Sequence, residues 1–591
     1  MTISLPPHMN TQQQYDEKPK KHSGKACCFF KAMKESDPHH KTSILFSFFH
    51  AMPHVDDPLH VLAMSALWSL AMSHPDDPTL PSLPPFFPSM ASLINKGLNN
   101  PDWLYKHQNI YIPYYAAHVI GSYSISTARS AELAVESGVI PPLVELLRGR
   151  LSWVEQRVAV RALGHLASYD STFEAILLYE EEIVALAMGI ASTCLESVYI
   201  EFMVIKKRNK ENSLSLKYQR ELLSRGLGDE AMEDRKAEEW ASQLQCWSIH
   251  LLSCFASGRR SSIRRICGDD GRFLKDLCNM WGGLANEKSP AGVGLLRILC
   301  RSRLGRKSVS QHKEVLLSLC NMCRSSDDWQ YMGIDCLLLL LHDENTRRDV
   351  VEVAGSYLAD LVELQELGKR RDVGGEIAHA LLLDFKNGAY RDNDVVKRAL
   401  EMVWEVKVER RKREDKMSRE AIENKRRIVS SKRRIGNGRF LCGDIEGAIE
   451  AYTEALELCP LKLRKERLVL YSNRAQCHLL LREPDNAISD STRAICLSSP
   501  ANSHGKSLWR RSQAYDAKGL AKESLLDCLM FLNGSLISSK EKKNKKNTRV
   551  PYYAVNMITK QMNAVGFFAD GAATQYLMTK KNKAKSESIW G

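Results

Sequence analysis

The fold of this chain is decided by one stretch, Ile435-Gly-Asn-Gly-Arg-Phe-Leu-Cys-Gly-Asp-Ile-Glu-Gly-Ala-Ile-Glu-Ala-Tyr-Thr-Glu-Ala-Leu-Glu-Leu-Cys-Pro460. Small residues at Gly436, Ala448 and Ala455 allow two neighbouring helices to cross closely. Pro460 ends the second helix, because proline cannot continue one. The stretch therefore predicts a pair of tightly packed helices that must stack on further pairs.

Read at a period of about 34 residues, this stretch resembles a tetratricopeptide repeat. The consensus places glycine at its eighth position, alanine at its twentieth and twenty-seventh, and proline at its thirty-second, as found here. A second copy begins near Leu468 and a third near Gly505, and a capping helix is expected at Val555–Met562. The later copies keep Ala487, Ala494, Tyr515 and Gly519 but depart from the consensus at Ser524 and Phe531. Three repeats are enough for a stable stack.

The repeats also resemble one subfamily, the dicarboxylate-clamp domains, which grip the Glu-Glu-Val-Asp terminus of cytosolic heat-shock chaperones. The five clamp positions are filled by Arg433, Asn437, Asn473, Lys506 and Arg510. Four match by identity, and Arg433 stands where lysine is usual. A terminal aspartate presents two carboxylates, which need cations and amide donors if neither is to remain unpaired. The resemblance implies that this domain binds the C-terminal tails of seventy- and ninety-kilodalton heat-shock chaperones.

The first two thirds of the chain show helical periodicity of another kind. Glu136–Arg148 has one apolar face, and Trp153–Ala167 has another that steps by four residues. This passage resembles an armadillo repeat, and weaker copies follow at a similar period. We therefore predict an armadillo/HEAT-like α-solenoid from Thr42 to Glu405 that binds a client or other partner. The charged segment Lys206–Ala241 interrupts it, either as a long exposed helix or as an insertion.

We predict an all-α protein: an N-terminal armadillo-like α-solenoid followed by a C-terminal three-repeat tetratricopeptide domain. The predicted divisions are a flexible leader (1–41), the solenoid (42–405), a basic connector (406–428), the tetratricopeptide domain (429–535) and a basic tail with a capping helix (536–591). The module order resembles plant armadillo/tetratricopeptide proteins. The muscle-myosin chaperone family combines the same modules in reverse order, so no myosin client is inferred.

Charge is concentrated in two places. The whole chain has a formal net charge of +13, whereas residues 407–439 carry +9 and residues 540–591 carry +8. The rest is slightly acidic, so no broad basic groove is expected, and the pattern does not favour nucleic acid as a partner. The tail is either a solvated segment or a patch for nuclear targeting or an acidic partner.

Several other classes of function find no support in the sequence. No run of 18 apolar residues predicts a membrane segment, and no phosphate-binding loop, nucleophile elbow or zinc-protease motif is present. The Cys320–Cys323 pair lacks the second pair that a zinc site needs. We predict no enzyme activity, cofactor, metal or small-molecule substrate, and a cytoplasmic co-chaperone or adaptor, with nuclear entry left open. The alternative is an armadillo-type transport or nuclear scaffold protein with a structural tetratricopeptide domain.

Overall fold

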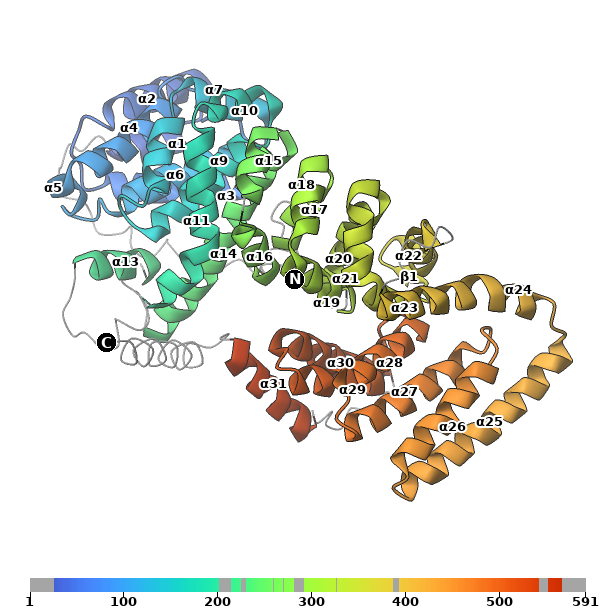
Figure 1. Ribbon diagram of the computed structural model, residues 1–591. Helices are drawn as coiled ribbons and strands as arrows, with labels where there is room; N and C mark the ends of the chain where they lie inside the picture. Colours follow the sequence, from blue (N-terminus) through green and yellow to red (C-terminus); the bar gives the residue numbers. More distant parts are fainter. Residues whose placement is uncertain are drawn as a thin grey trace, which may run out of the picture. The chain divides into compact units, whose positions relative to one another are not determined.

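A computed structural model gives the architecture of the chain (Figure 1). It describes residues 26–200, 214–224, 230–258, 260–268, 270–280, 292–325, 327–385, 393–541 and 551–565. These residues divide between two compact units, 1–298 and 299–591. The first part of the predicted leader and most of the predicted tail, including the basic run Lys542–Lys546, lie outside the described residues.

The described part of the first unit is helical throughout. Its helices are α1 (Ala26–Lys34), α2 (Pro38–Ala51), α3 (His60–Ser73), α4 (Phe86–Asn99), α5 (Pro101–Leu104), α6 (Tyr111–Ser124), α7 (Ala128–Glu136), α8 (Ile140–Leu147), α9 (Trp153–Leu166), α10 (Asp170–Leu177), α11 (Glu180–Val198), α13 (Leu214–Ser224), α14 (Glu230–Gly258), α15 (Arg260–Cys267), α16 (Arg272–Asn279) and α17 (Gly292–Cys300), which crosses the unit boundary. The long helices α3, α6, α9 and α14 pack on one another in that order.

Helices α7, α8 and α9 form the predicted armadillo unit. Gly138 has φ of 74°, a left-handed conformation that glycine adopts without strain, and it turns the chain between α7 and α8. The side chain of Ser152 caps α9 by accepting a hydrogen bond from the backbone N–H of Val154 at 3.1 Å. Val154, Val158, Ala162 and Leu166, which step by four residues along α9, are all buried. The helical repeat predicted from this passage is therefore present.

Two segments of this unit differ in detail from the sequence-based expectation. Helices begin at α1, before Thr42, and the buried ring of Phe29 packs against Phe48 of α2. The charged segment Lys206–Ala241 contains α13 and the first half of α14. Its second half is thus the start of a repeat helix and not an insertion, because α14 continues to Gly258 and packs on α9 and α11.

The second unit contains the end of the solenoid and the tetratricopeptide repeats. Its elements are α18 (Arg303–Gln311), α19 (Lys313–Cys323), α20 (Asp327–His342), α21 (Glu344–Ala359), β1 (Glu366–Leu367), β2 (Arg370–Arg371), α22 (Val373–Leu382), α23 (Asp394–Trp404), the π-helical turn η3 (Glu405–Glu409), α24 (Arg410–Asp415), α25 (Arg419–Leu441), α26 (Ile445–Leu458), α27 (Arg464–Leu480), α28 (Pro484–Leu497), α29 (Gly505–Ala517), α30 (Ala521–Glu541) and α31 (Tyr552–Val565). Strands β1 and β2 form a small antiparallel hairpin that was not predicted.

Helices α25 to α30 form three consecutive pairs, each packed on the next (Figure 1). Gly436 of α25 lies against the ring of Tyr452 of α26, where a Cβ atom would stand 2.7 Å from a ring carbon. This contact leaves no room for a larger side chain at position 436. The predicted capping helix is present as α31, which packs on α30 and whose Tyr553 contacts the ring of Trp509 with centroids 4.7 Å apart.

The predicted connector is helical and attached to the repeats. Arg410 donates a hydrogen bond to the carbonyl of Leu456, and the carboxylate of Glu414 accepts one from the backbone N–H of Leu461 at 2.6 Å. Both side chains are mostly buried in this contact. Helix α24 is therefore fixed to the α26–α27 corner, and the start of the tetratricopeptide domain at residue 429 stays a prediction.

The close approach at Gly436 gives a test with a matched control. Gly436→Ala should lower the free energy of unfolding by about 1–3 kcal/mol, because the new methyl group overlaps the buried ring of Tyr452. Gly438→Ala should raise it by about 0.5–1 kcal/mol, since a Cβ there meets no described heavy atom within 4 Å and alanine favours the helix. Urea denaturation of both variants measures the difference. Equal effects would contradict the packing described for α25 and α26.

A buried carboxyl gives a second test. Glu155 of α9 is fully buried and accepts hydrogen bonds from the hydroxyls of Ser152 and, at 2.7 Å, Tyr218. Burial raises its pKa to about 7, although both hydrogen bonds act in the opposite direction. A raised carboxyl pKa favours folding at low pH, and that contribution is lost as the pH rises from about 4.5 through 7.

We therefore expect Glu155→Gln to stabilise the first unit at pH 8, by on the order of 3 kcal/mol, and to change little at pH 4.5. Glutamine is neutral at both pH values and keeps a similar shape. Thermal melts followed by circular dichroism at several pH values measure the change. A variant as pH-dependent as the natural protein would show that Glu155 is ionised when folded at neutral pH.

Candidate functional site

The five residues of the predicted clamp lie on the first helices of three successive repeats. Arg433 and Asn437 are one turn apart on α25, Asn473 is on α27, and Lys506 and Arg510 are one turn apart on α29. Lys506 and Asn437 are exposed, and the other three are partly buried. None of the five is used as a core residue.

Two amides of this set are hydrogen-bonded to each other, and a tyrosine hydroxyl bonds to the same oxygen. The hydroxyl of Tyr452 donates a hydrogen bond to Oδ1 of Asn437 at 2.8 Å, and the amide of Asn473 donates to the same oxygen at 3.3 Å. Because Oδ1 of Asn437 accepts both bonds, the Nδ2 amino group of Asn437 remains available as a hydrogen-bond donor. The arrangement orients two amide side chains side by side across α25 and α27.

Arg510 is positioned by α27. Its Nε donates to Oε1 of Gln476 at 3.0 Å, and its Nη1 donates to the carbonyl oxygen of Ser472 at 2.7 Å. Burial lowers the pKa of the Arg510 guanidinium from its ordinary value, but arginine remains charged at neutral pH. Two helices thus hold a cation in a fixed, partly desolvated place.

The charges of Arg433, Lys506 and Arg510 shift the pKa values of two neighbouring side chains. Burial raises the pKa of the Tyr452 hydroxyl, and the charges of Arg510 and Arg433 oppose that rise. Burial, followed by the charges of Arg510 and Lys506, lowers the pKa of His504 to about 4. Among the described residues, none of these cations forms an ion pair with a carboxylate. The structure therefore brings the set together as an electropositive surface without a counter-charge.

Three further residues of this surface were missed in the sequence. Tyr452 orients Asn437, Gln476 holds Arg510, and His504 lies next to the Lys506 and Arg510 charges. Gln476 could have been found from helical spacing, because it lies three residues after Asn473 on the same face. The other two gave no signal, since their roles depend on contacts between helices.

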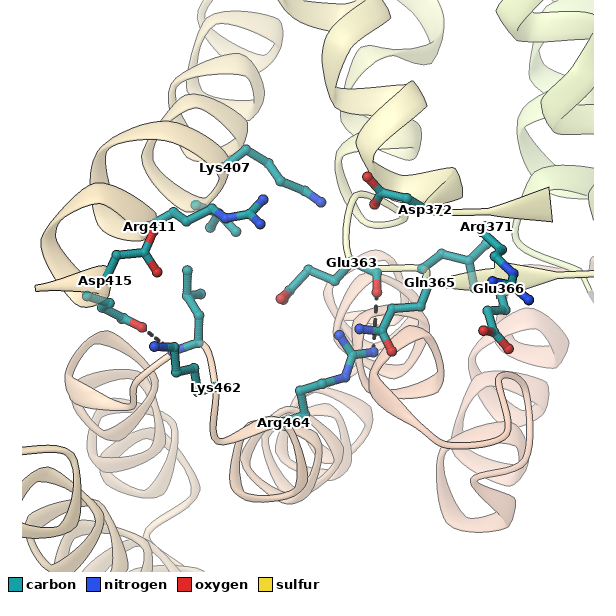
Figure 2. A pocket seen from close by; sticks show the side chains of 14 residues that line it. Glu363, Gln365, Glu366, Arg371, Asp372, Lys407, Arg411, Asp415, Lys462 and Arg464 are labelled. Atoms are coloured by element: carbon teal, nitrogen blue, oxygen red, sulfur yellow. Dashed lines mark hydrogen bonds between the residues drawn. The ribbon is translucent and has the colours of Figure 1, made fainter. Parts of the chain in front are cut away.

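A separate cavity of about 610 Å³ lies in the second unit, away from this surface (Figure 2). Charged side chains of both signs line it, among them Glu363, Asp372, Lys407, Arg411 and Arg464. Figure 2 shows Lys407 and Asp372 directed toward one another across the cavity. Burial lowers the pKa of Lys407, and the charges of Asp372 and Glu363 partly offset that effect. Its charges are balanced within the cavity, and no residue of the predicted clamp lines it.

The Cys320–Cys323 pair lies inside a helix of the second unit. Cys320 and Cys323 are buried one turn apart in α19, where burial raises the pKa of Cys320 to about 12. Within the described ranges, no group of three or more histidine, cysteine, aspartate or glutamate side chains could hold a metal ion. No helix in the part of the chain that the structure describes is both long and apolar enough to span a bilayer.

Comparison with known proteins finds a family match in the first region. Residues 20–268 match the family model described as "Plant ARM repeat". The matched range covers the helices from α1 to α15, including the repeat formed by α7, α8 and α9.

Three curated relatives match shorter stretches. Protein unc-45 homolog B of Danio rerio is 38% identical over 84 residues, which is 14% of this chain and 9% of the relative. Mitochondrial import receptor subunit TOM70 of Homo sapiens is 35% identical over 92 residues, 16% of this chain and 15% of the relative. DnaJ homolog subfamily C member 7 homolog of Dictyostelium discoideum is 32% identical over 143 residues, 23% of this chain and 26% of the relative. The chain therefore spans at most about a quarter of the length of these relatives.

The electropositive surface formed by the predicted clamp residues can be tested through the pKa of His504. Lys506→Gln should move the pKa of His504 from about 4 toward the ordinary histidine value, because it removes one of the two charges that disfavour the imidazolium. Arg434→Gln on α25 is the control and should leave it unchanged. Side-chain NMR of ¹⁵N-labelled histidines across a pH titration measures both, with His504→Asn identifying the signal. A His504 pKa that does not respond to Lys506→Gln would contradict the placing of Lys506 beside His504 on this surface.

Proposed function

Because the chain is an armadillo- and tetratricopeptide-repeat protein, we propose that it is a non-enzymatic adaptor whose tetratricopeptide domain binds the carboxyl terminus of a partner protein. The observation that carries this proposal is the surface formed by Arg433, Asn437, Asn473, Lys506 and Arg510. It combines three cations and two amides on the first helices of three successive repeats, and within the described residues it lacks a carboxylate of its own.

The chemistry of this surface fits a peptide that ends in aspartate. Such a terminus carries a main-chain carboxylate and a side-chain carboxylate only a few ångströms apart, so it requires several charge-assisted hydrogen bonds. Arg510 is already held by Gln476 and Ser472, and its geometry therefore costs little further entropy to fix when the peptide binds. Lys506 is exposed and can approach the same terminus from α29.

The partners that best satisfy this chemistry are the Glu-Glu-Val-Asp tails of seventy- and ninety-kilodalton heat-shock chaperones. The similarity to the DnaJ homolog and the unc-45 homolog supports a chaperone-associated role. In this proposal the armadillo-type solenoid binds a client or another partner, and the protein acts in the cytoplasm as a co-chaperone. The transport or nuclear scaffold alternative would leave the tetratricopeptide surface without a ligand.

The test is peptide binding by the full chain. Lys506→Ala should weaken binding of a labelled Glu-Glu-Val-Asp peptide by more than tenfold, because losing one charge-assisted contact costs about 1.5–3 kcal/mol. Arg510→Ala should have at least as large an effect, whereas Arg433→Lys should be mild. Fluorescence anisotropy gives the dissociation constants, and amidating the peptide terminus should weaken binding of the natural protein.

Arg434→Ala is the matched control, since this exposed arginine adjoins Arg433 on α25 and belongs to no part of the proposed clamp. Lys506→Ala is more informative than Arg510→Ala, because Arg510 also bonds to α27 and its loss can disturb packing. If Lys506→Ala binds the tail as tightly as the natural protein does, the tetratricopeptide domain is structural and the proposal fails.

A further inference from the structure

The first unit contains a second electropositive site, on the repeat helices α6, α9 and α14, which lie side by side (Figure 1). Arg157 and Arg161 stand one turn apart on α9. Among the described residues, neither guanidinium has a carboxylate within ion-pair distance. Arg157 is only 6% exposed, and its Nε has no hydrogen-bond partner. Two neighbouring, partly desolvated cations without a counter-charge are costly to keep in a folded protein.

Aromatic rings form the walls of this site. The guanidinium carbon of Arg157 lies 4.1 Å from the ring centroid of Trp240, and that of Arg161 lies 5.7 Å from that of Trp247. Tyr114 stacks on Trp240 with an interplanar angle of 10°. Its hydroxyl also accepts a hydrogen bond from Arg157 at 2.9 Å. These contacts fix the planes of both arginines but do not neutralise their charge.

Arg161 presents an unused edge. Its Nη1 lies 3.3 Å from Oγ of Ser122 and 3.4 Å from Nδ1 of His118, whereas in the described part of the chain Nε and Nη2 donate to no acceptor. Nε and Nη2 form one edge of the planar guanidinium, the edge that binds a carboxylate through two parallel bonds. Burial and the charge of Arg157 lower the pKa of Arg161 to about 10, which an anion at this edge would reverse.

From this geometry we propose that the α6–α9–α14 face binds an extended acidic peptide, with one carboxylate on Arg161 and neighbouring apolar side chains on Trp240 and Trp247. The two tryptophans are partly exposed and stand two turns apart on α14, farther than a small anion reaches. Nucleic acid fits less well, because it needs a row of accessible cations to follow its phosphates, and here only Arg161 is accessible. The carboxylate is an aspartate or glutamate side chain within the peptide.

The test separates this site from the proposed clamp. Random dodecapeptides displayed with their C-termini fused to a phage coat protein are selected on the full-length Lys506→Ala variant, so that free termini and the clamp play no part. Selected peptides should share an aspartate or glutamate and should bind Arg161→Met at least tenfold more weakly. Synthetic copies with an amidated C-terminus should bind the Lys506→Ala variant as tightly as copies with a free one, whereas replacing the conserved acid by alanine should weaken binding at least tenfold.

Two further variants control for folding and for charge in general. Arg161→Lys keeps the charge but lacks the two-pronged edge, and it should weaken binding without unfolding the chain. Arg129→Met removes a surface arginine on α7 that already has Glu132 and Glu136 as partners, and it should change nothing. Peptides without acidic residues, peptides that bind Arg161→Met equally well, or no selected peptide at all would overturn the proposal. If a single-stranded RNA decamer bound the natural protein, displaced the selected peptides and failed to bind Arg161→Met, the proposal would be overturned in favour of nucleic acid.

Discussion

The second unit depends on two buried carboxylates at the end of α21. Asp360 is 2% exposed and pairs with Arg324 and, at 2.9 Å, with Arg493 of α28. Glu363 pairs through both oxygens with Arg467 of α27. Burial raises the pKa of each carboxyl, but the adjacent arginines lower it by more, so both remain ionised at neutral pH. Breaking such a pair leaves an uncompensated buried charge, which costs about 3–5 kcal/mol.

These ion pairs give α27 two distinct functional faces. On one side Arg467 reaches Glu363, and its guanidinium lies 5.9 Å from the centroid of the Tyr471 ring. On the other side Asn473 and Gln476 meet the residues of the proposed clamp. The same helix therefore anchors the repeats to the preceding helices and arranges the ligand-facing groups. A rigid anchor favours a groove whose cations are already in place before a ligand arrives.

The repeat architecture could be predicted because close helix crossings constrain single positions, as Gly436 against Tyr452 illustrates. The candidate clamp could be located because its five positions recur at fixed places in each repeat.

Other features could not be predicted. The pairing of Arg467 with Glu363 gave no sequence signal, since the two residues are 104 positions apart. Arg157 and Arg161 could not be recognised as a site from the sequence, because their aromatic neighbours come from other helices. Phe29 was assigned to a flexible leader because one buried ring in a polar segment gives no periodic signal.

The anchoring pairs also determine which pieces of this protein can be studied in isolation. A tetratricopeptide domain produced alone from residue 406 onward would lack both Asp360 and Glu363. Arg467 and Arg493 would then face solvent beside Tyr471, without the anions that balance them. Such a fragment would adhere to nucleic acids and other polyanions, so an interaction screen that used it as bait would recover false partners. Fragments that begin before α18 would keep the balance of charge and report the natural surface.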